Sequence, residues 1–182
     1  RVVGVIPSRW GSTRFPGKSL ALVGGRPLLA WVVDRARQAR RLDELRVATD
    51  DERIAAVARS WGVPVAITSP AHPSGTDRIA EAIQDIRADV VVNIQGDEPL
   101  IDPVLIDRVA GVLADSEGWD METAAAPVIS AEELHNPDVV KVVRDRNGQA
   151  LYFSRAVIPF VRGAGAEFAP VAGLHFRHIG IY

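Results

Sequence analysis

Three fixed cations, Arg9, Arg14 and Lys18, follow a short apolar run at the start of the sequence. The run, Val2 to Ile6, predicts a buried strand, and the glycines and prolines after it predict a loop. Ligands of open α/β sheets bind at loops that leave the carboxyl ends of strands. Backbone N–H groups surrounded by guanidinium and ammonium groups suit a polyphosphate, although a sulfate-like or carboxylate ligand also fits. The segment therefore predicts an anion site, with a nucleoside triphosphate as the leading candidate and a solvated basic turn as the alternative.

The same segment shares only its last residues with the phosphate-binding P-loop. Gly17-Lys18-Ser19 matches the end of that motif, which needs four residues between its two glycines. Here five residues separate Gly11 from Gly17, and the chain after Lys18 does not open an amphipathic helix. The pattern therefore disfavours a kinase or ATPase of the P-loop class.

A second group of polar residues follows another apolar run. Val90 to Ile94 predicts a buried strand that delivers Gln95, Asp97 and Glu98 to the same edge of the sheet as the basic loop. Mg²⁺ prefers one or two carboxylates together with phosphate oxygens and water. The two segments together predict a Mg²⁺ site, with Asp97 as the ligand because Glu98 precedes a proline. A solvated loop or a helix cap is the alternative for these carboxylates.

Composition limits the class of protein. With 182 residues, of which 47% are hydrophobic and 24% charged, the chain is typical of one globular domain with a substantial core. Its formal net charge of −2 favours neither nucleic acid nor an anionic membrane as a partner. The absence of cysteine excludes disulfides, thiolate metal sites and a cysteine nucleophile. Since no apolar stretch approaches about 20 residues and no signal-peptide pattern opens the sequence, we expect a cytoplasmic protein without membrane insertion.

Apolar residues spaced at i, i+3, i+4 and i+7 recur four times, with short apolar runs between them. The spacing predicts helices near residues 28–40, 54–61, 79–86 and 106–113. Cap signals precede three of them, at Asp50-Asp51, at Ser74 with Asp77, and at Asp102-Pro103. The runs predict strands at 2–6, 45–48, 63–67 and 90–94. This alternation predicts an α/β fold with a mostly parallel central sheet and helices on both faces, of the Rossmann-like kind.

The pattern changes after about residue 120. Predicted strands at 123–129, 139–144, 151–154 and 175–182 follow one another, and Asn147-Gly148 is a hairpin signal. We expect a single domain over 1–182, made of an α/β half at 1–119 and a smaller strand-rich region at 120–182. The last strand is expected to run in the parallel sheet and to stop at Tyr182 with its partners unaccounted for.

Several motifs of this chain resemble those of a known enzyme family. Pro7 to Lys18 resembles the signature loop of the sugar nucleotidylyltransferases, and the whole chain resembles the 3-deoxy-manno-octulosonate (Kdo) cytidylyltransferase family within that group. The other matching motifs, in chain order, are Ala48-Thr-Asp-Asp51, Ser74-Gly-Thr-Asp-Arg78, Gln95-Gly-Asp-Glu-Pro99, Asn136-Pro137 with Val140-Lys-Val-Val143, Leu151-Tyr-Phe-Ser-Arg155 and His178-Ile-Gly-Ile-Tyr182. Each motif is modest alone, but together they cover essentially all residues in the right order. Two departures, Ser8 and Trp10, stand where the family more often has Ala and Tyr.

The resemblance implies a nucleotidyltransferase fold of the GT-A type and a role for each matching residue. The implied CTP contacts are Arg9, Ser12, Arg14, Lys18, Ser74, Gly75 and Arg78. The implied catalytic residues are Lys18, Arg14 and Asp97, and Asp97 is the implied Mg²⁺ ligand. The implied sugar-acid contacts are Gln95, Arg155, His178 and Tyr182, with Arg155 suited to a bidentate bond to the carboxylate.

The resemblance also implies a reaction and an assembly. The anomeric hydroxyl of Kdo attacks the α-phosphate of CTP and pyrophosphate leaves, giving CMP-Kdo for lipopolysaccharide-type glycoconjugates. The implied nucleotide-binding part is 1–119, and residues 120–182 are expected to bind the sugar and to join a homodimer. The family pattern continues past Tyr182, where a second acidic Mg²⁺ ligand is expected, so a chain ending there is expected to be incomplete.

Several alternatives stay open. Arg155 follows Tyr152 and Phe153, which are expected to be buried, but it also suits a plain surface strand, and His178 equally suits a structural histidine. The four tryptophans are expected to lie mostly in the core or on helix faces, and no aromatic–basic pattern indicates nucleic acid binding. For function, the alternatives are a cytidylyltransferase for another sugar acid, such as sialic acid, a different sugar-1-phosphate nucleotidylyltransferase, and a nucleotide-binding or assembly protein without activity.

Overall fold

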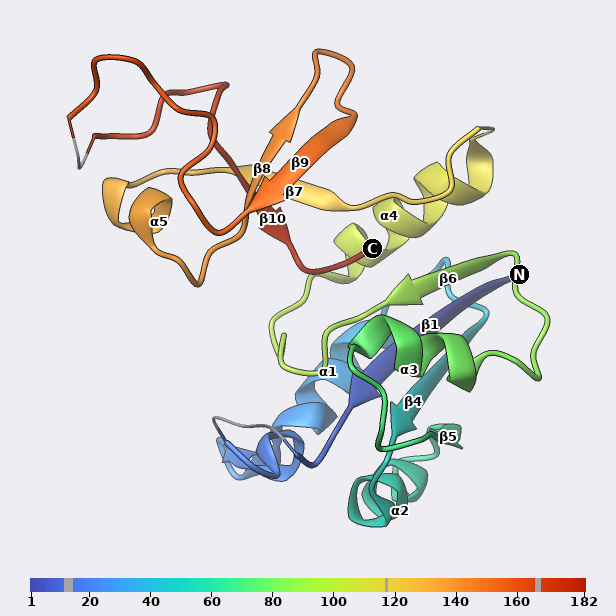
Figure 1. Ribbon diagram of the computed structural model, residues 1–182. Helices are drawn as coiled ribbons and strands as arrows, with labels where there is room; N and C mark the ends of the chain where they lie inside the picture. Colours follow the sequence, from blue (N-terminus) through green and yellow to red (C-terminus); the bar gives the residue numbers. More distant parts are fainter. Residues whose placement is uncertain (12–14, 117, 166–167) are drawn as a thin grey trace. The chain divides into compact units, whose positions relative to one another are not determined.

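The computed structural model of the chain describes residues 1–11, 15–116, 118–165 and 168–182 (Figure 1). These residues form two compact units. The first unit contains Arg1–Glu122 together with Ile181–Tyr182, and the second contains Thr123–Gly180. The division falls beside the point near residue 120 at which the sequence pattern changes.

A four-stranded parallel sheet forms the centre of the first unit. Its strands are β1 (Val2–Ser8), β4 (Glu44–Thr49), β5 (Val65–Ile67) and β6 (Val90–Asn93), in the order β5-β4-β1-β6. Along the chain, β4 is added beside β1 and β5 beside β4, and β6 is then added on the other side of β1. The strand order therefore reverses between β1 and β6, which is the point at which ligands bind in open α/β sheets.

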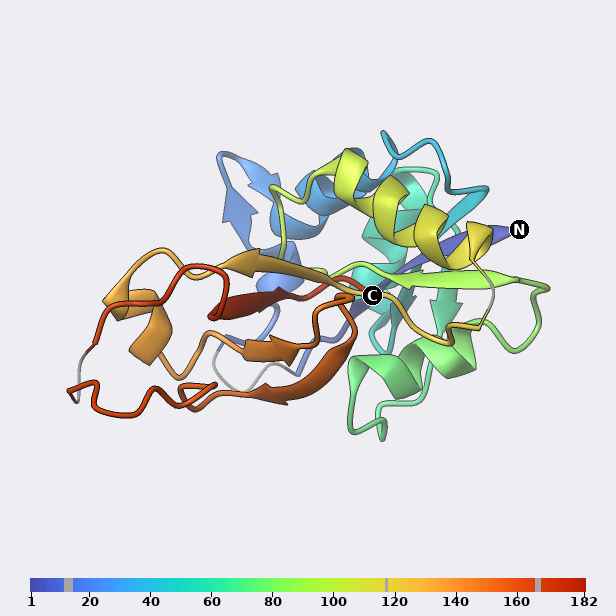
Figure 2. The same cartoon turned by 90° about the horizontal axis from the view of Figure 1, so that it is seen from above.

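Helices cover both faces of this sheet, as the sequence predicts. The helices are α1 (Leu28–Ala36), α2 (Glu52–Ser60), α3 (Gly75–Ala82) and α4 (Pro103–Asp115). Helices α1 and α4 contact each other on one face, and α3 covers the opposite face (Figures 1 and 2). Because apolar side chains lie on both sides of it, β1 is buried along almost its whole length. The core under α3 joins Val3, Val5, Ala48 and Ile79.

The predicted caps fix where three helices begin. The side chain of Asp51 accepts a hydrogen bond from the backbone N–H of Arg53, and Asp102 does the same for Val104. The Ser74 hydroxyl accepts from the backbone N–H of Asp77. Each cap residue accepts a hydrogen bond from an N–H group of the first helical turn that would otherwise have no partner in the helix. The three cap residues therefore mark the positions at which these helices begin.

Short elements in the first unit escaped the sequence patterns. They are a 3₁₀ turn, η1 (Lys18–Leu20), and a hairpin of β2 (Leu22–Val23) and β3 (Arg26–Pro27). Both follow the basic loop and lead the chain into α1. With two or three residues each, they are too short to show a periodic pattern.

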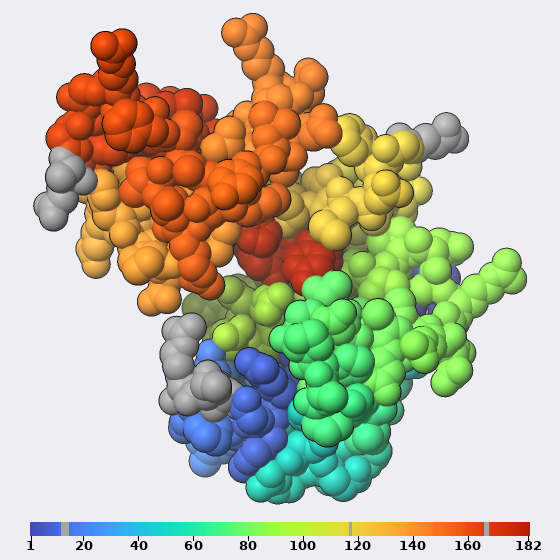
Figure 3. Space-filling view, in the orientation of Figure 1, coloured from blue at the N-terminus to red at the C-terminus, as the bar shows by residue number. Residues whose placement is uncertain are grey.

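The second unit is an antiparallel sheet with one short helix. Its elements are β7 (Ala124–Pro127), α5 (Ala131–His135), β8 (Lys141–Arg144), β9 (Ala150–Ser154) and β10 (Phe176–Ile179), and its strand order is β7-β10-β8-β9. The turn between β8 and β9 contains Gly148 with a φ of 94°, and this turn projects from the unit (Figure 3). The predicted hairpin at Asn147-Gly148 is therefore confirmed.

One expectation about the end of the chain is wrong. Residues 175–182 do not add a strand to the parallel sheet, because β10 pairs antiparallel with β7 and β8. Ile181 and Tyr182 then return to the first unit, where the Tyr182 carbonyl accepts a hydrogen bond of 2.7 Å from the Asn93 N–H. The alternation of a single strand cannot distinguish a parallel from an antiparallel partner.

None of the helices in the part of the chain that the structure describes is both long enough and apolar enough to cross a membrane.

Gly96, just past β6, is a position at which the neighbouring backbone leaves no room for a methyl group. A Cβ there would lie 2.9 Å from the Pro7 carbonyl oxygen of β1. Gly96→Ala should lower the free energy of unfolding by about 1–3 kcal/mol, measured by urea denaturation, because neither backbone can yield cheaply. Gly165→Ala, where a Cβ meets nothing within 4 Å, is the matched control and should change stability by less than about 0.5 kcal/mol. Equal stabilities of the two variants would contradict this account.

Candidate active site

A cavity of about 610 Å³ opens at the carboxyl ends of β1 and β6. Its walls come from the loops after these strands and from the start of α3. The lining residues are Pro7, Ser8, Arg9, Phe15, Lys18, Ser19, His72, Pro73, Ser74, Gly75, Arg78, Gln95, Gly96 and Asp97. The volume suits a nucleotide-sized ligand. The prediction that the basic loop and the acidic strand end share one edge of the sheet is confirmed.

Lys18 and Asp97 meet directly on the wall of this cavity. The Lys18 Nζ lies 2.7 Å from an Asp97 carboxylate oxygen, and the two side chains are 42% and 52% exposed. An exposed ion pair of this kind contributes between about 0 and 1 kcal/mol to stability. Because the pair contributes so little free energy, Lys18 can leave Asp97 for an anionic ligand, and Asp97 can leave Lys18 for a cation.

The donor set around Asp97 fits a Mg²⁺ shared with phosphates rather than a closed protein site. Within the described residues, no group of three or more His, Cys, Asp or Glu side chains converges as a metal site. Asp97 instead offers one exposed carboxylate in a cavity that also holds cations for phosphate groups. Mg²⁺ commonly takes one or two carboxylates and completes its shell with phosphate oxygens and water.

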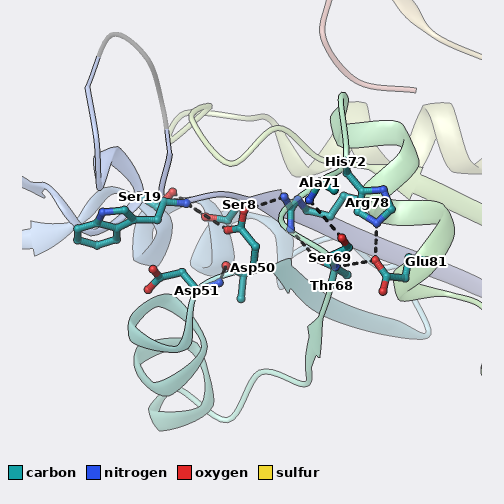
Figure 4. Close-up of polar contacts among 12 residues, drawn as sticks. Ser8, Ser19, Asp50, Asp51, Thr68, Ser69, Ala71, His72, Arg78 and Glu81 are labelled. Carbon is teal, nitrogen blue, oxygen red and sulfur yellow. Dashed lines mark hydrogen bonds and ion pairs between the residues drawn. The ribbon is translucent and has the colours of Figure 1, made fainter.

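Arg78 differs from the other predicted CTP contacts because its guanidinium is already bonded. It is 3% exposed, and it donates one hydrogen bond to Thr68 Oγ1 and one of 3.0 Å to Asp50 (Figure 4). Asp50 follows β4, and Thr68 follows β5. Arg78 therefore ties α3 to the ends of two neighbouring strands as well as lining the cavity.

Asp50 is a residue whose role the sequence analysis missed. The pair Asp50-Asp51 reads as a helix cap, but only Asp51 caps α2, and Asp50 pairs with the buried Arg78. The signal that could have identified Asp50 was its position directly after a predicted strand, at the same edge of the sheet as Lys18 and Asp97.

The first turn of α3 forms another wall. Ser74 and Gly75 are exposed there, and the Ser74 hydroxyl both accepts from the Asp77 N–H and donates to the Asp77 carboxylate at 2.5 Å. The N-terminus of a helix favours negative charge. Of the predicted CTP contacts, Ser74 and Gly75 line the cavity. Ser12 and Arg14 lie outside the described residues.

His72 also lines the cavity and carried no sequence signal. Its Nε2 bonds the Glu81 carboxylate, which in turn accepts a hydrogen bond of 2.8 Å from the Ser69 N–H (Figure 4). The hydrogen bond from His72 is the main reason that the pKa of Glu81 lies below its ordinary value of 4.5. The pair fixes the loop between β5 and α3.

The four predicted sugar-acid contacts divide between the two units. Gln95 lines the cavity of the first unit, and Tyr182 lies in the same unit with its hydroxyl 2.6 Å from Thr76 Oγ1 of α3. Arg155 and His178 lie in the second unit.

Arg155 follows β9 and donates a hydrogen bond of 2.8 Å to the Pro137 carbonyl. The expectation that Tyr152 and Phe153 are buried is wrong, because their exposed fractions are 63% and 41%. The physical reason is that β9 is the edge strand of its sheet, so it has a neighbouring strand on one side only among the described residues.

Beside Arg155 lies Lys141, a fully buried lysine of β8. Its Nζ donates to the carbonyls of Asn136 and Val139 at 2.9 and 2.7 Å. Burial, with a smaller contribution from the Arg155 charge, lowers its pKa from the ordinary 10.5. Two cations therefore share the segment 136–140, and this segment presents carbonyl oxygens to both.

His178 is held on β10 as a half-buried side chain. Its Nε2 lies 2.8 Å from the Thr123 hydroxyl, and its ring makes an edge contact with Phe153. Burial lowers the pKa of His178 below its ordinary value of 6.5.

This shift predicts a pH dependence of stability. As the pH falls through 6.5 the unfolded chain binds a proton at His178 while the folded chain does not, so unfolding becomes more favourable until the lower folded pKa is reached. The stability of the wild type relative to His178→Gln should therefore decrease between pH 7.5 and pH 5, measured by urea denaturation. Other titrating groups cancel in this difference. A difference that stays constant or grows would show that His178 is not held neutral.

Several known proteins are similar to this chain over all or nearly all of its length. The cytidylyltransferase family profile matches residues 3–182. A 3-deoxy-manno-octulosonate cytidylyltransferase of Bdellovibrio bacteriovorus is 50% identical over 182 residues, which is all of this chain and 73% of that protein. The protein of the same name from an Anaeromyxobacter species is 52% identical over 184 residues, covering all of this chain and 72% of that protein.

A solved structure supports the same assignment. CMP:2-keto-3-deoxy-manno-octonic acid synthetase complexed with CTP superposes with a TM-score of 0.85 at 38% identity, covering all of this chain and 72% of that chain. The fold and the resemblance predicted from the sequence are thus confirmed. This chain belongs to the cytidylyltransferase family and, within it, to the 3-deoxy-manno-octulosonate cytidylyltransferases.

Proposed function

We propose that this protein transfers the cytidylyl group of CTP to 3-deoxy-manno-octulosonate, giving CMP-Kdo and pyrophosphate. The observation that carries the proposal is the cavity at the ends of β1 and β6, where Lys18 and Asp97 meet at 2.7 Å. The relatives' names and the CTP-bound neighbour support the choice of nucleotide and sugar acid. We expect the reaction to take place in the cytoplasm, where CTP is available.

The chemistry requires positioning and charge neutralisation more than covalent help. The anomeric hydroxyl oxygen of Kdo forms a bond to the α-phosphorus, the bond from that phosphorus to the bridging oxygen of the pyrophosphate breaks, and the hydroxyl proton passes to water. Negative charge grows on the departing pyrophosphate, and fixed cations stabilise it. Arg9 and Lys18 line the cavity and supply that charge, and Arg14 and Ser12 join them by resemblance alone.

Asp97 is proposed as the Mg²⁺ ligand. A Mg²⁺ held by Asp97 and phosphate oxygens would add charge neutralisation at the phosphates. With a cation on its carboxylate, Asp97 would no longer be paired with Lys18, and the Lys18 ammonium would be available to a phosphate oxygen. The salt bridge between them thus keeps both charges compensated until substrate arrives.

Further residues are proposed, from the resemblance, to hold the nucleoside and the sugar acid. Ser74 and Gly75 lie at the start of α3 and are proposed to contact the nucleotide, and the hydrogen bond from Arg78 to Asp50 holds the start of α3 in place. Gln95, Tyr182, His178 and Arg155 are proposed to bind the sugar acid, with the Arg155 guanidinium on its carboxylate.

The direct test is an assay of pyrophosphate release by the purified protein. Release should require CTP, Mg²⁺ and Kdo together. Comparable rates with ATP or UTP would refute the nucleotide assignment, and turnover with sialic acid but not with Kdo would refute the sugar assignment. CTP binding without turnover on any sugar acid would indicate a binding protein instead.

Lys18→Ala and Asp97→Asn should each lower turnover by about two or more orders of magnitude, because each removes one preorganised charge from the reacting phosphates. Their melting temperatures should stay close to that of the wild type, because the ion pair is exposed. Asp34→Asn is a matched control, since it breaks another exposed pair, Arg26–Asp34 at 2.6 Å, away from the cavity. A variant of Lys18 or Asp97 that keeps wild-type turnover would remove that residue from the mechanism.

Arg155→Ala should raise the KM for the sugar acid about tens- to hundred-fold and leave the KM for CTP within about twofold. The loss of a charge-assisted bond to a carboxylate is worth about 2–3 kcal/mol. Arg146→Ala, an exposed arginine in the β8–β9 turn, is the control. A shift in the CTP requirement instead would place Arg155 on the nucleotide.

We also propose a homodimer formed through the second unit. Leu151, Tyr152 and Phe153 are 61%, 63% and 41% exposed on the edge strand β9. An apolar edge strand with open backbone groups is a surface that proteins usually cover. Light scattering measures the mass directly, and a monomer would contradict the proposal.

A further inference from the structure

The loop that carries Arg9 and Lys18 is closed at its base by two pairs of residues, Ser8 with Ser19 and Trp10 with Gly17, here called the loop neck. The Ser8 hydroxyl donates a hydrogen bond of 2.6 Å to the Ser19 hydroxyl, and both side chains are buried. One step further out, the Gly17 N–H donates a hydrogen bond of 2.9 Å to the Trp10 carbonyl. The two ends of the loop are thus tied together twice.

The Trp10 side chain strengthens the second tie. Gly17 has a φ of 70°, and a Cβ on it would lie 2.8 Å from the Trp10 Cη2. The indole ring therefore lies directly against the Gly17 backbone. This contact requires glycine at position 17 for two reasons, the positive φ and the space that the ring occupies.

A charged side chain of α2 holds the ring. The Arg53 guanidinium lies 3.3 Å from the centroid of the Trp10 ring, within the range of a cation–π interaction. Arg53 also makes hydrogen bonds of 2.9 and 2.7 Å to the two carboxylate oxygens of Asp51, the cap of α2. The guanidinium is thus fixed in direction, so the ring has one preferred position.

The backbone of Trp10 is tied to the cavity wall as well. Its N–H donates a hydrogen bond of 3.3 Å to Asp50, which also accepts from the buried Arg78. Figure 4 shows Asp50 and Arg78 within one network that reaches Thr68. Trp10 is thus an exception to the expectation that the tryptophans lie mostly in the core or on helix faces, because it is a loop residue with four separate tethers.

We propose that Trp10 is a positioning residue for nucleotide binding, which sets the places of Arg9 and Lys18 by clamping the loop neck against Arg53 and Asp50. Arg9 precedes Trp10 and Lys18 follows Gly17, so each cation adjoins a clamped residue. Trp10 is not among the residues that line the cavity, and it acts through its neighbours. The proposal rests on the proposed function, since it assigns the loop to CTP.

The clamp itself is tested without nucleotide. Amide hydrogen exchange of Gly17 reports the bond from its N–H to the Trp10 carbonyl, and we expect slow exchange in the wild type. Trp10→Ala should accelerate it at least about tenfold and Arg53→Met about threefold, as expected when local contacts that hold a loop closed are lost. Trp119→Ala, an exposed tryptophan elsewhere in the unit, should leave it unchanged. Unchanged Gly17 exchange in Trp10→Ala or Arg53→Met would overturn the clamp.

Positioning is tested by CTP affinity, measured by calorimetry on the same variants. Trp10→Ala should weaken CTP binding by about ten- to hundredfold while the KM for the sugar acid stays within about twofold, and Trp10→Tyr should restore affinity to within about threefold. Arg53→Met should weaken CTP binding less than Trp10→Ala. The double variant should bind like Trp10→Ala alone, because Arg53 acts only through the ring.

The outcomes separate the two proposals. Additive losses for Trp10→Ala and Arg53→Met would show that Arg53 acts on CTP by another route and would overturn the clamp mechanism. Wild-type CTP affinity in Trp10→Ala, or an equal rise in the sugar-acid KM, would overturn the positioning role. If Trp10→Ala fails to fold, Arg53→Met still tests the clamp through Gly17 exchange and the positioning role through CTP affinity. No CTP binding by the wild type would refute the proposed function, while Gly17 exchange would still test the clamp.

Discussion

The close approach of two backbones at the carboxyl ends of β1 and β6 is the constraint on which the rest of the site depends. The Ile94 N–H donates to the Val5 carbonyl at 3.0 Å, and Gly96 passes so near the Pro7 carbonyl that no side chain fits. These contacts bring the loop after β1 and the loop after β6 to one point. The cations of the first loop and the carboxylate of the second then meet without any long connecting element.

Two ion pairs around the cavity have opposite physical properties. Asp50 and Arg78 form a largely buried pair, and removing one partner of such a pair costs about 3–5 kcal/mol because the other charge is left without compensation. Lys18 and Asp97 form an exposed pair that contributes little to stability. The buried pair therefore sets a fixed frame for the cavity wall, and the exposed pair is the part that a charged substrate can rearrange. A site that holds a polyphosphate and then releases pyrophosphate benefits from both properties.

The sequence predicted the first unit well because its signals are local and repeated. Apolar spacing, strand runs and the caps at Asp51, Ser74 and Asp102 each specify one element, and the alternation of elements specifies a parallel sheet. The same signals placed Lys18 and Asp97 at one edge.

The sequence did not show which residues far apart along the chain contact one another in the fold. Nothing near Arg78 along the chain shows that Asp50 neutralises it, and nothing near Trp10 shows that Arg53 covers its ring. The burial of Tyr152 and Phe153 was predicted wrongly for a related reason, since an aromatic strand has the same composition at an edge as in a centre. The direction of β10 failed likewise, because pairing direction is set by the neighbours of a strand and not by its own residues.

The return of Ile181 and Tyr182 to the first unit makes the second unit an insertion, with both of its ends held by the same domain. The bond between the Tyr182 carbonyl and the Asn93 N–H therefore joins positions separated by the whole inserted segment. The entropy lost on closing a loop grows only logarithmically with its length, so this closure costs little more than that of a far shorter loop. During synthesis, however, Asn93 emerges long before Tyr182. The Asn93 N–H at the end of β6 therefore lacks this partner until the inserted sheet has been synthesised, so this link between β6 and Tyr182 forms late in the folding of the chain.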